Sequence, residues 1–237
     1  MQALSPAVAA VFDPVQTATT LEETVERLGT AIRLGLLGPG DRLPPERDLA
    51  DQLGIARSTL RQALTSLTES GHLIAQRGRG GGTFVSAAPP LAESSRADLD
   101  RGHWREVLDY RIAVEVGTVV LATERARPED LARLRAHVET MRAAGEFPAY
   151  RRADVFFHLG LAETARSARL VAAMTEVQGQ MSELIGHIAH PLPVLARSNE
   201  QHAALVDALE RGDDRTAAQI VREHLKGTEQ VLAGLMP

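Results

Sequence analysis

The chain has 237 residues, of which 44% are hydrophobic and 24% are charged, and its formal net charge is −5 at pH 7. These values are typical of a globular protein that is large enough for two domains with buried cores. The absence of cysteine excludes disulfide bonds, thiol catalysis and cysteine-bound metals, and an aromatic content of 3% argues against a stacking surface for single-stranded nucleic acids.

No apolar run approaches the length of a membrane span, and the first residues lack the positively charged start of a signal peptide. We therefore expect a cytoplasmic protein that does not enter a membrane. Residues 1–18 lack periodicity, which predicts a flexible N-terminal arm. From Thr20 to about Leu37 apolar residues recur at helical spacing, and the sequence GPG at 38–40 is expected to end this helix.

Residues 40–85 predict a helix, a sharp turn, a second helix and a two-stranded wing. The first helix is expected at about 45–53, because its initial proline suits the first helical position, and Gly54 permits the turn that follows. The second helix is expected to begin near Arg57 and to end at Gly71, with a buried apolar stripe and a polar first turn. This arrangement predicts a winged helix-turn-helix domain at 19–86.

The polar first turn of the second helix carries the donors that a recognition helix places in the major groove of DNA. The predicted strands at 73–75 and 83–85 flank a basic, glycine-rich tip that can approach a phosphate backbone closely. Together these elements supply seven candidate DNA contacts: Arg57, Ser58, Thr59, Arg61, Arg77, Gly78 and Arg79. Residues 53–86 contain four arginines and one acidic residue, and a local positive charge on an acidic chain favours DNA binding over a helical hairpin with solvated arginines.

Residues 87–103 are predicted to form a linker, because they combine two prolines with small and polar residues. From residue 104 onward the pattern is helical, with no strand-like alternation. Helices are expected at about 104–124, 128–144, 149–165, 168–188, 199–211 and 214–233, the fifth beginning at a capping box at 198–201. The predicted fold class is therefore mainly α, with the winged domain followed by an all-α bundle at 104–237.

A carboxylate and several imidazoles are candidates for a metal site in this bundle. Asp154 and His158 are four residues apart on one predicted helix and so share a face, and His202 and His224 come from two further helices. Such a set would bind a divalent transition metal, Zn, Ni or Mn, and would leave two positions on an octahedral ion for a small ligand. Ordinary surface or core histidines are the alternative. Two histidines near a proline-rich break are weaker ligand candidates: His187 and His190.

Arg111 lies in an apolar part of the first predicted bundle helix. A guanidinium in such surroundings is costly to bury without an anion. Two interpretations remain open: a structural ion pair with Glu115, one turn further along the helix, or a position facing the metal, where Arg111 would hold a carboxylate ligand through a bidentate pair.

The sequence LPPERDLADQLGIARSTLRQAL, followed by GTFV, resembles the winged helix-turn-helix signature of the GntR family of bacterial transcription regulators. This resemblance implies DNA contacts at Arg47, Arg57, Thr59, Arg61 and Gly78. Two residues depart from the family pattern. Pro45 replaces a serine, and Ala56 replaces a serine or threonine whose side chain would cap the second helix and could reach a phosphate.

The segments VLDYRIAVE, DVFFH, EQHAALVDALERGD and REHL resemble the FCD ligand-binding domain of the FadR subfamily of GntR regulators. The resemblance implies an ion held by Asp154, His158, His202 and His224, and an effector-binding role for the arginine at 111. Ala168 stands near a position where the family often has asparagine, which removes one polar group expected near the effector pocket.

The chain is thus predicted to be a repressor controlled by a small carboxylate. One recognition helix covers too few base pairs for genomic specificity, so we expect a homodimer on a palindromic operator in double-stranded DNA. A metal-independent regulator that binds an acyl-CoA is the alternative. A metal-dependent enzyme is disfavoured, because Glu163 and Glu176 lie in no recognisable catalytic motif and a winged domain has no purpose in an ordinary enzyme. We therefore expect no catalytic residues.

Overall fold

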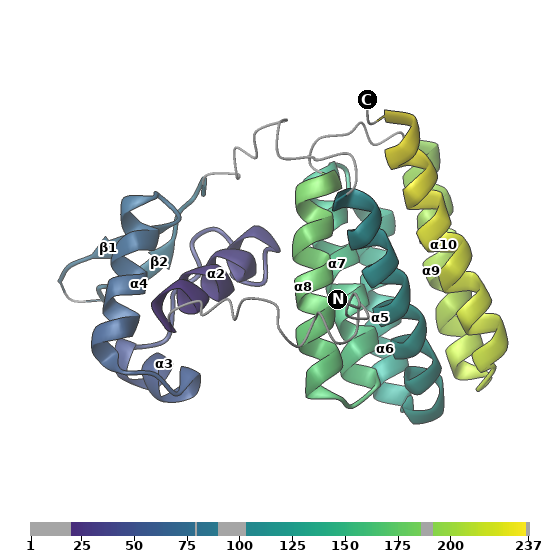
Figure 1. The fold of residues 1–237 in the computed structure, drawn as a ribbon, viewed down its shortest axis with the longest axis horizontal. Coiled ribbons are helices and arrows are strands. Elements are labelled where there is room, and N and C mark those ends of the chain that lie inside the picture. Colours follow the sequence, from purple (N-terminus) through teal and green to yellow (C-terminus); the bar gives the residue numbers. More distant parts are fainter. Residues whose placement is uncertain (1–19, 79, 90–102, 186–191, 236–237) are drawn as a thin grey trace, which may run out of the picture. The chain divides into compact units, whose positions relative to one another are not determined.

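The computed structural model describes residues 20–78, 80–89, 103–185 and 192–235. They form two compact units, one built around the winged domain and one around the helical bundle (Figure 1). Within these residues there are nine helices and a single two-stranded antiparallel sheet. The predicted fold class is confirmed: a winged helix-turn-helix domain is followed by an all-α bundle. No helix in the described ranges is long and apolar enough to cross a membrane.

The winged unit consists of three helices and the wing: α2 (Thr20–Arg33), α3 (Glu46–Leu53), α4 (Arg57–Glu69), β1 (Leu73–Gln76) and β2 (Gly82–Val85). One apolar face of each helix builds its core, in which Leu28, Leu49 and Leu60 are buried. Gly54 ends α3 in the left-handed conformation, with φ of 67°, and so allows the predicted turn into α4. The two strands pair from Leu73 opposite Val85 to the wing tip.

Two details of this unit differ from the prediction. Pro45 precedes α3 as its cap residue, so the helix begins at Glu46 and not at the proline. The wing also has a third extended segment, which the sequence pattern did not reveal. Arg42 forms a bridge with Phe84 of β2, and the backbone N–H of Leu43 donates to the carbonyl of Thr83 at 2.9 Å. The segment before α3 therefore covers the outer edge of β2.

The bundle contains the six expected helices: α5 (His103–Arg125), α6 (Pro128–Ala143), α7 (Phe147–Thr164), α8 (Ala168–Ile185), α9 (Leu192–Glu210) and α10 (Asp214–Leu235). The predicted start of the fifth is wrong, because α9 begins at Leu192 and runs through the supposed capping box. Pro193 is tolerated there because the first-turn N–H groups of a helix have no intrahelical partner. Asn199 lies inside the helix, and its side-chain amide donates to the Val138 carbonyl at 3.3 Å.

Helix α7 occupies the centre of the bundle and packs against α5, α6 and α8. One apolar cluster surrounds Phe157 and Leu161 and includes Val206 of α9 and Val221 of α10. A second cluster lies between α5, α7 and α8. Because α7 is buried on most of its faces, its polar residues must find partners inside the protein, and these partners form the candidate functional site.

The bundle unit includes five residues from much earlier in the chain, Arg33–Leu37. The first of them is the last residue of α2, which ends at Arg33 and not near Leu37 as predicted, and the other four follow the helix. Leu34 is 2% exposed and belongs to the same apolar cluster as Trp104 and Met181. This segment lies within the range expected for the winged domain, 19–86, yet it packs with the bundle. The expected arm at 1–18 and most of the expected linker at 87–103 lie outside the described residues.

Candidate functional site

The structure brings the four predicted metal ligands together in the bundle core: Asp154 and His158 on α7, His202 on α9 and His224 on α10. Each imidazole offers one nitrogen to a group whose members lie within 4.8 Å of one another. Asp154 Oδ1 lies 3.8 Å from His158 Nε2 and 3.5 Å from His202 Nε2. Transition metals bind such atoms at about 2.0–2.2 Å, which sets neighbouring ligand atoms roughly 3–3.5 Å apart. The donor set therefore fits a metal ion.

The buried ring nitrogens give a second test of this fit. All four side chains are buried. Among the described residues, His158 Nε2, both ring nitrogens of His202 and His224 Nδ1 have no hydrogen-bond partner. Buried polar atoms are nearly always paired, because leaving one unsatisfied destabilises a protein by about 1–3 kcal/mol. A bound ion would satisfy several of these nitrogens at once.

The electrostatics of the cluster also suit a cation. Burial lowers the pKa of His202 to about 3, and burial together with the neighbouring His202 ring lowers the pKa of His224. Both rings are therefore neutral near pH 7, as a metal ligand must be. Burial by itself would raise the pKa of Asp154, but His158 and Arg151 hold it well below its usual range. The cluster thus combines an anionic oxygen on Asp154 with the neutral rings of His202 and His224.

Glu115 of α5 orients His158 from outside the cluster. Its Oε2 lies 2.8 Å from His158 Nδ1, which leaves Nε2 on the side of Asp154. Its Oε1 accepts from Arg111 Nε at 2.7 Å and from Gln178 Nε2 at 3.2 Å. Although burial alone would raise the pKa of Glu115, the Arg111 guanidinium and the His158 ring hold it far below its usual range. Carboxylates that hold a ligating histidine in this way fix its tautomer and orientation.

Arg151 performs a similar task for Asp154 and was not identified from the sequence. Its Nη1 donates to Asp154 Oδ2, three residues further along α7. Its Nη2 donates to the backbone carbonyl and the side-chain oxygen of Gln178, at 3.1 and 3.0 Å, and to Ser182 Oγ at 3.0 Å. The spacing of three residues between Arg151 and Asp154 on one predicted helix could have indicated their contact. Nothing in the sequence indicated the contacts of Arg151 with α8.

A cavity of about 510 Å³ adjoins the cluster, and its lining includes Arg111, Asp154 and His224. The ion pair between Arg111 and Glu115 is present, as the first interpretation of Arg111 required. Arg111 also lines the cavity, and its Nη1 is buried without a hydrogen-bond partner in the described part of the chain. The ion pair therefore leaves donor capacity on the guanidinium for a ligand, and the effector-binding role stays a prediction.

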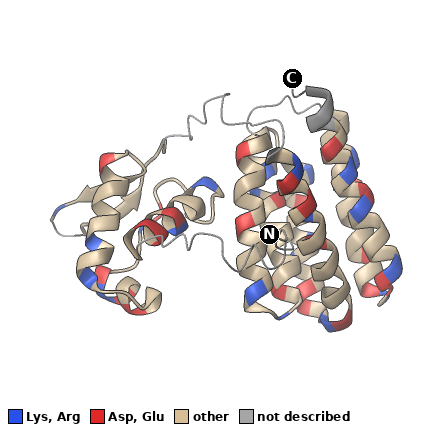
Figure 2. Ribbon diagram, viewed as in Figure 1, with Lys and Arg blue, Asp and Glu red and all other residues tan. Residues whose placement is uncertain are grey.

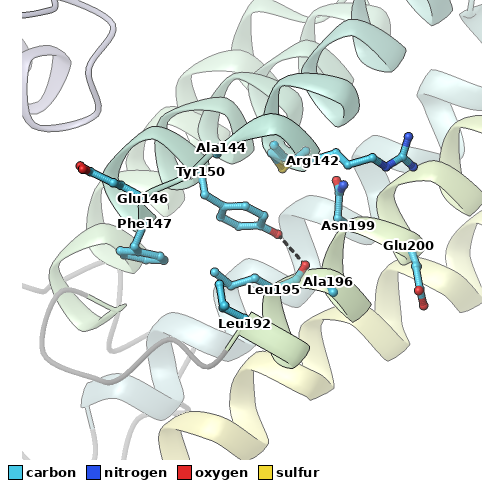
Figure 3. A pocket seen from close by; sticks show the side chains of 12 residues that line it. Arg142, Ala144, Glu146, Phe147, Tyr150, Leu192, Leu195, Ala196, Asn199 and Glu200 are labelled. Carbon is cyan, nitrogen blue, oxygen red and sulfur yellow. Dashed lines mark hydrogen bonds between the residues drawn. The ribbon is translucent and has the colours of Figure 1, made fainter.

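A second cavity, of about 460 Å³, lies between the end of α6 and the starts of α7 and α9 (Figure 3). Phe147, Tyr150 and Leu195 line both cavities. The Tyr150 hydroxyl donates to the Leu195 carbonyl at 3.3 Å, the contact drawn dashed in Figure 3. Tyr150 therefore joins α7 to the first turns of α9 at the wall between the two cavities.

The candidate DNA contacts that the structure describes lie on the surface of the winged unit, and Figure 2 shows basic residues along α4 and at the wing tip. Arg57 and Ser58 are exposed at the start of α4, while Thr59 is half-buried. Arg61 is exposed but forms an ion pair with Glu46 of α3 at 2.8 Å. The other contacts are placed as follows: Arg47 is exposed on α3, Arg77 and Gly78 are exposed at the wing tip, and Arg79 lies outside the described residues.

Two further features shape this surface. Ala56 precedes α4 without a side-chain cap, as its sequence implied. Arg42, which was not identified from the sequence, donates through Nη2 to the Gly81 carbonyl at 2.6 Å, and its guanidinium lies 5.9 Å from the centre of the Phe84 ring. Arg42, in the segment before α3, therefore stabilises the wing tip. The candidate ligands His187 and His190 lie outside the described residues.

Comparison with known proteins identifies the family to which a chain with these two units belongs. Residues 20–85 match the model of bacterial regulatory proteins of the gntR family, and residues 106–227 match the model of the FCD domain. The chain belongs to the GntR family. It is a DNA-binding transcriptional regulator with an FCD effector-binding domain, and the expectation that it is not an enzyme is confirmed by its family.

Full-length relatives support the GntR assignment. The putative HTH-type transcriptional regulator RmpR of Mycobacterium gastri is 34% identical over 211 residues, which cover 85% of this chain and 76% of the relative. The putative L-lactate dehydrogenase operon regulatory protein of Escherichia coli is 31% identical over 218 residues, covering 86% and 83%. The structure of E. coli McbR/YncC has the same fold, with a TM-score of 0.58 and 20% identity over 92% of this chain and 99% of the other.

Proposed function

We propose that this GntR regulator detects a small carboxylate metabolite through a divalent transition metal, Zn, Ni or Mn, held by Asp154, His158, His202 and His224. The observation that carries the proposal is the buried group of unpartnered imidazole nitrogens beside a cavity of about 510 Å³. The bound metal would supply a positive centre with positions left for a ligand oxygen. Glu115 and Arg151 would hold two of its ligands in place.

Arg111 gives the cavity its preference for an acid. Its Nε is occupied by Glu115, whereas its Nη1 is buried and free to donate to a ligand. A carboxylate beside the metal would accept from this guanidinium and so remove an unsatisfied buried donor. The relative from E. coli is named as regulator of an L-lactate dehydrogenase operon, and this name also favours a hydroxy acid or sugar acid as the effector.

Effector binding would control operator binding in the cytoplasm, most simply as release of a repressor. We infer a homodimer that binds a palindromic operator through two copies of α4, because one helix reads too few base pairs. The effector would act by favouring one arrangement of the bundle helices, and it can shift that equilibrium only by its difference in affinity for the two arrangements. DNA and effector must then change each other's affinity by the same factor.

Native mass spectrometry and calorimetry with lactate, citrate, gluconate and galacturonate test the metal and the effector together. We expect metal in the wild type and in the control His137→Ala, whose ring stacks on Phe156 away from the cluster. His202→Ala and His224→Ala should lose it, together with the stability that metal binding adds to the native state.

The arginine is tested by Arg111→Lys, which keeps a charge beside Glu115 but loses the planar fork. This variant should retain metal and bind the acid about tenfold more weakly. Full metal occupancy in both histidine variants would overturn the ligand assignment and point to His187 or His190. Equal acid binding by metal-free protein and by the arginine variant would overturn the pocket. A wild type without metal would favour the acyl-CoA alternative.

A further inference from the structure

The fixed charges around the metal cluster cancel one another. Two guanidinium groups, on Arg111 and Arg151, face two carboxylates, on Glu115 and Asp154, and all four side chains are buried or nearly so. A divalent ion bound by neutral imidazoles would therefore leave this part of the core with two uncompensated positive charges. Uncompensated charge in the interior is strongly unfavourable, so a ligand with two negative charges is favoured over one with a single charge.

The rest of the cavity lining adds positive charge. Arg197 of α9 and Lys226 of α10 line the cavity and are exposed at its rim, opposed by a single acid, Glu223. In the described part of the chain neither rim cation is engaged in an ion pair. Four cations and two acids thus line the cavity, with two of the cations at the buried cluster and two at the rim.

The size of the cavity also favours a ligand with two anionic groups. At about 510 Å³ it falls within the range of pockets that enclose ligands much larger than a three-carbon acid, roughly 300–1,000 Å³. A ligand as small as lactate, held at the metal, would leave the rim cations without an anion. A longer molecule can occupy both ends of the cavity.

We propose that the effector carries a second anionic group, a carboxylate or a phosphate, at the end of its carbon chain that is far from the first carboxylate. This inference rests on the proposed metal and carboxylate site. The first carboxylate binds at the metal and Arg111, and the second anionic group binds at Arg197 and Lys226. Dicarboxylic hydroxy acids, aldaric acids and phosphorylated sugar acids share this chemistry.

Pairs of ligands that differ only in the second anion test the inference by calorimetry on the metal-loaded protein. Glucarate is compared with gluconate, and malate with 2-hydroxybutyrate; 6-phosphogluconate tests phosphate in place of the second carboxylate. We expect at least one dianion to bind about tenfold or more tightly than its monoanionic partner, with a steeper loss of affinity as salt is added. The tighter of glucarate and 6-phosphogluconate identifies the second group.

The rim is tested with Arg197→Gln and Lys226→Gln, and with Arg222→Gln as a matched control that removes an exposed charge from α10 outside the cavity. Each rim variant should weaken binding of the dianion by roughly three- to tenfold and leave the monoanion unchanged, and the control should affect neither. Equal affinity within both ligand pairs would overturn the inference while the carboxylate site stands. A dianion preference that survives both rim variants would overturn the assignment of Arg197 and Lys226. Failure of every acid to bind would overturn the proposed function as well.

Discussion

At the scale of single residues, the arginines of the winged unit differ in what surrounds them. Arg57 is exposed in the first turn of α4, where a recognition helix meets base edges, whereas Arg77 is exposed at the wing tip beside Gly78, whose φ is 103°. Arg61 is also on α4 but shares its charge with Glu46. An exposed pair of this kind is worth at most about 1 kcal/mol, so DNA can displace Glu46 from Arg61 at little expense.

Two substitutions separate contacts with bases from contacts with phosphate. Arg57→Ala is expected to weaken operator binding by roughly 1–3 kcal/mol and to relax the sequence preference. Arg77→Ala should weaken binding to all sequences alike and reduce the salt slope by about 1, because one phosphate contact is lost. Fluorescence anisotropy on operator and unrelated DNA at several salt concentrations measures both effects.

Arg215→Ala serves as the control for these two variants, since it removes an exposed arginine from α10 in the bundle. It should leave both the affinity and the salt slope unchanged. Wild-type affinity for the operator in Arg57→Ala would refute the base contact. A changed sequence preference with an unchanged salt slope in Arg77→Ala would argue that the wing reads bases.

At the scale of elements, α7 contributes to two clusters through two faces. Asp154 and His158 belong to the cluster of candidate metal ligands, while Val155 and Leu159 belong to the apolar cluster that contains Leu34. The segment that carries Leu34 connects α2 to α3 of the winged unit. The bundle is therefore linked through the chain to the DNA-binding unit at 33–37 as well as at 87–103, and the first of these connections packs in the same apolar cluster as α7.

Leu34→Ala should therefore destabilise the bundle, although its position in the sequence is within the DNA-binding half. Removing a fully buried leucine destabilises a protein by about 2–5 kcal/mol, and Leu34 is 2% exposed. Thermal unfolding followed by circular dichroism measures the loss. Ile74→Ala is the matched control, because Ile74 is 45% exposed and its truncation should change stability little. Equal unfolding temperatures for Leu34→Ala and the wild type would contradict the packing of this segment.

At the scale of the whole molecule, the prediction is a homodimer whose two copies of α4 read a palindrome. Half-sites should be separated by one helical turn of DNA, about 10 base pairs, or by a multiple of it. Analytical ultracentrifugation with a palindromic operator should show two chains per duplex. A duplex with one half-site should bind far more weakly. A monomer that binds a single half-site with full affinity would refute the dimer.

Much of the molecule could be read from residues close together in the chain. The apolar stripe of α4, the turn at Gly54 and the shared face of Asp154 and His158 depend on spacings of up to four residues, which helical geometry converts directly into faces. The same spacing made an ion pair of Arg111 with Glu115 one of the two interpretations that the sequence left open, and this pair is present. The sequence by itself therefore determined the two units, the winged fold and the set of side chains available for a metal.

Only the tertiary structure decided how these faces meet. The contact of Glu115 with His158, the three hydrogen bonds from Arg151 to α8 and the burial of Leu34 in the bundle all join residues from different helices or segments. The start of α9 at Leu192 overrode a plausible capping signal, because local preferences of about 1 kcal/mol yield to the packing of a whole helix. Periodicity specifies which residues share a face, but packing of the complete core determines which face each one meets, and the cavity beside the histidines exists only as a result of that packing.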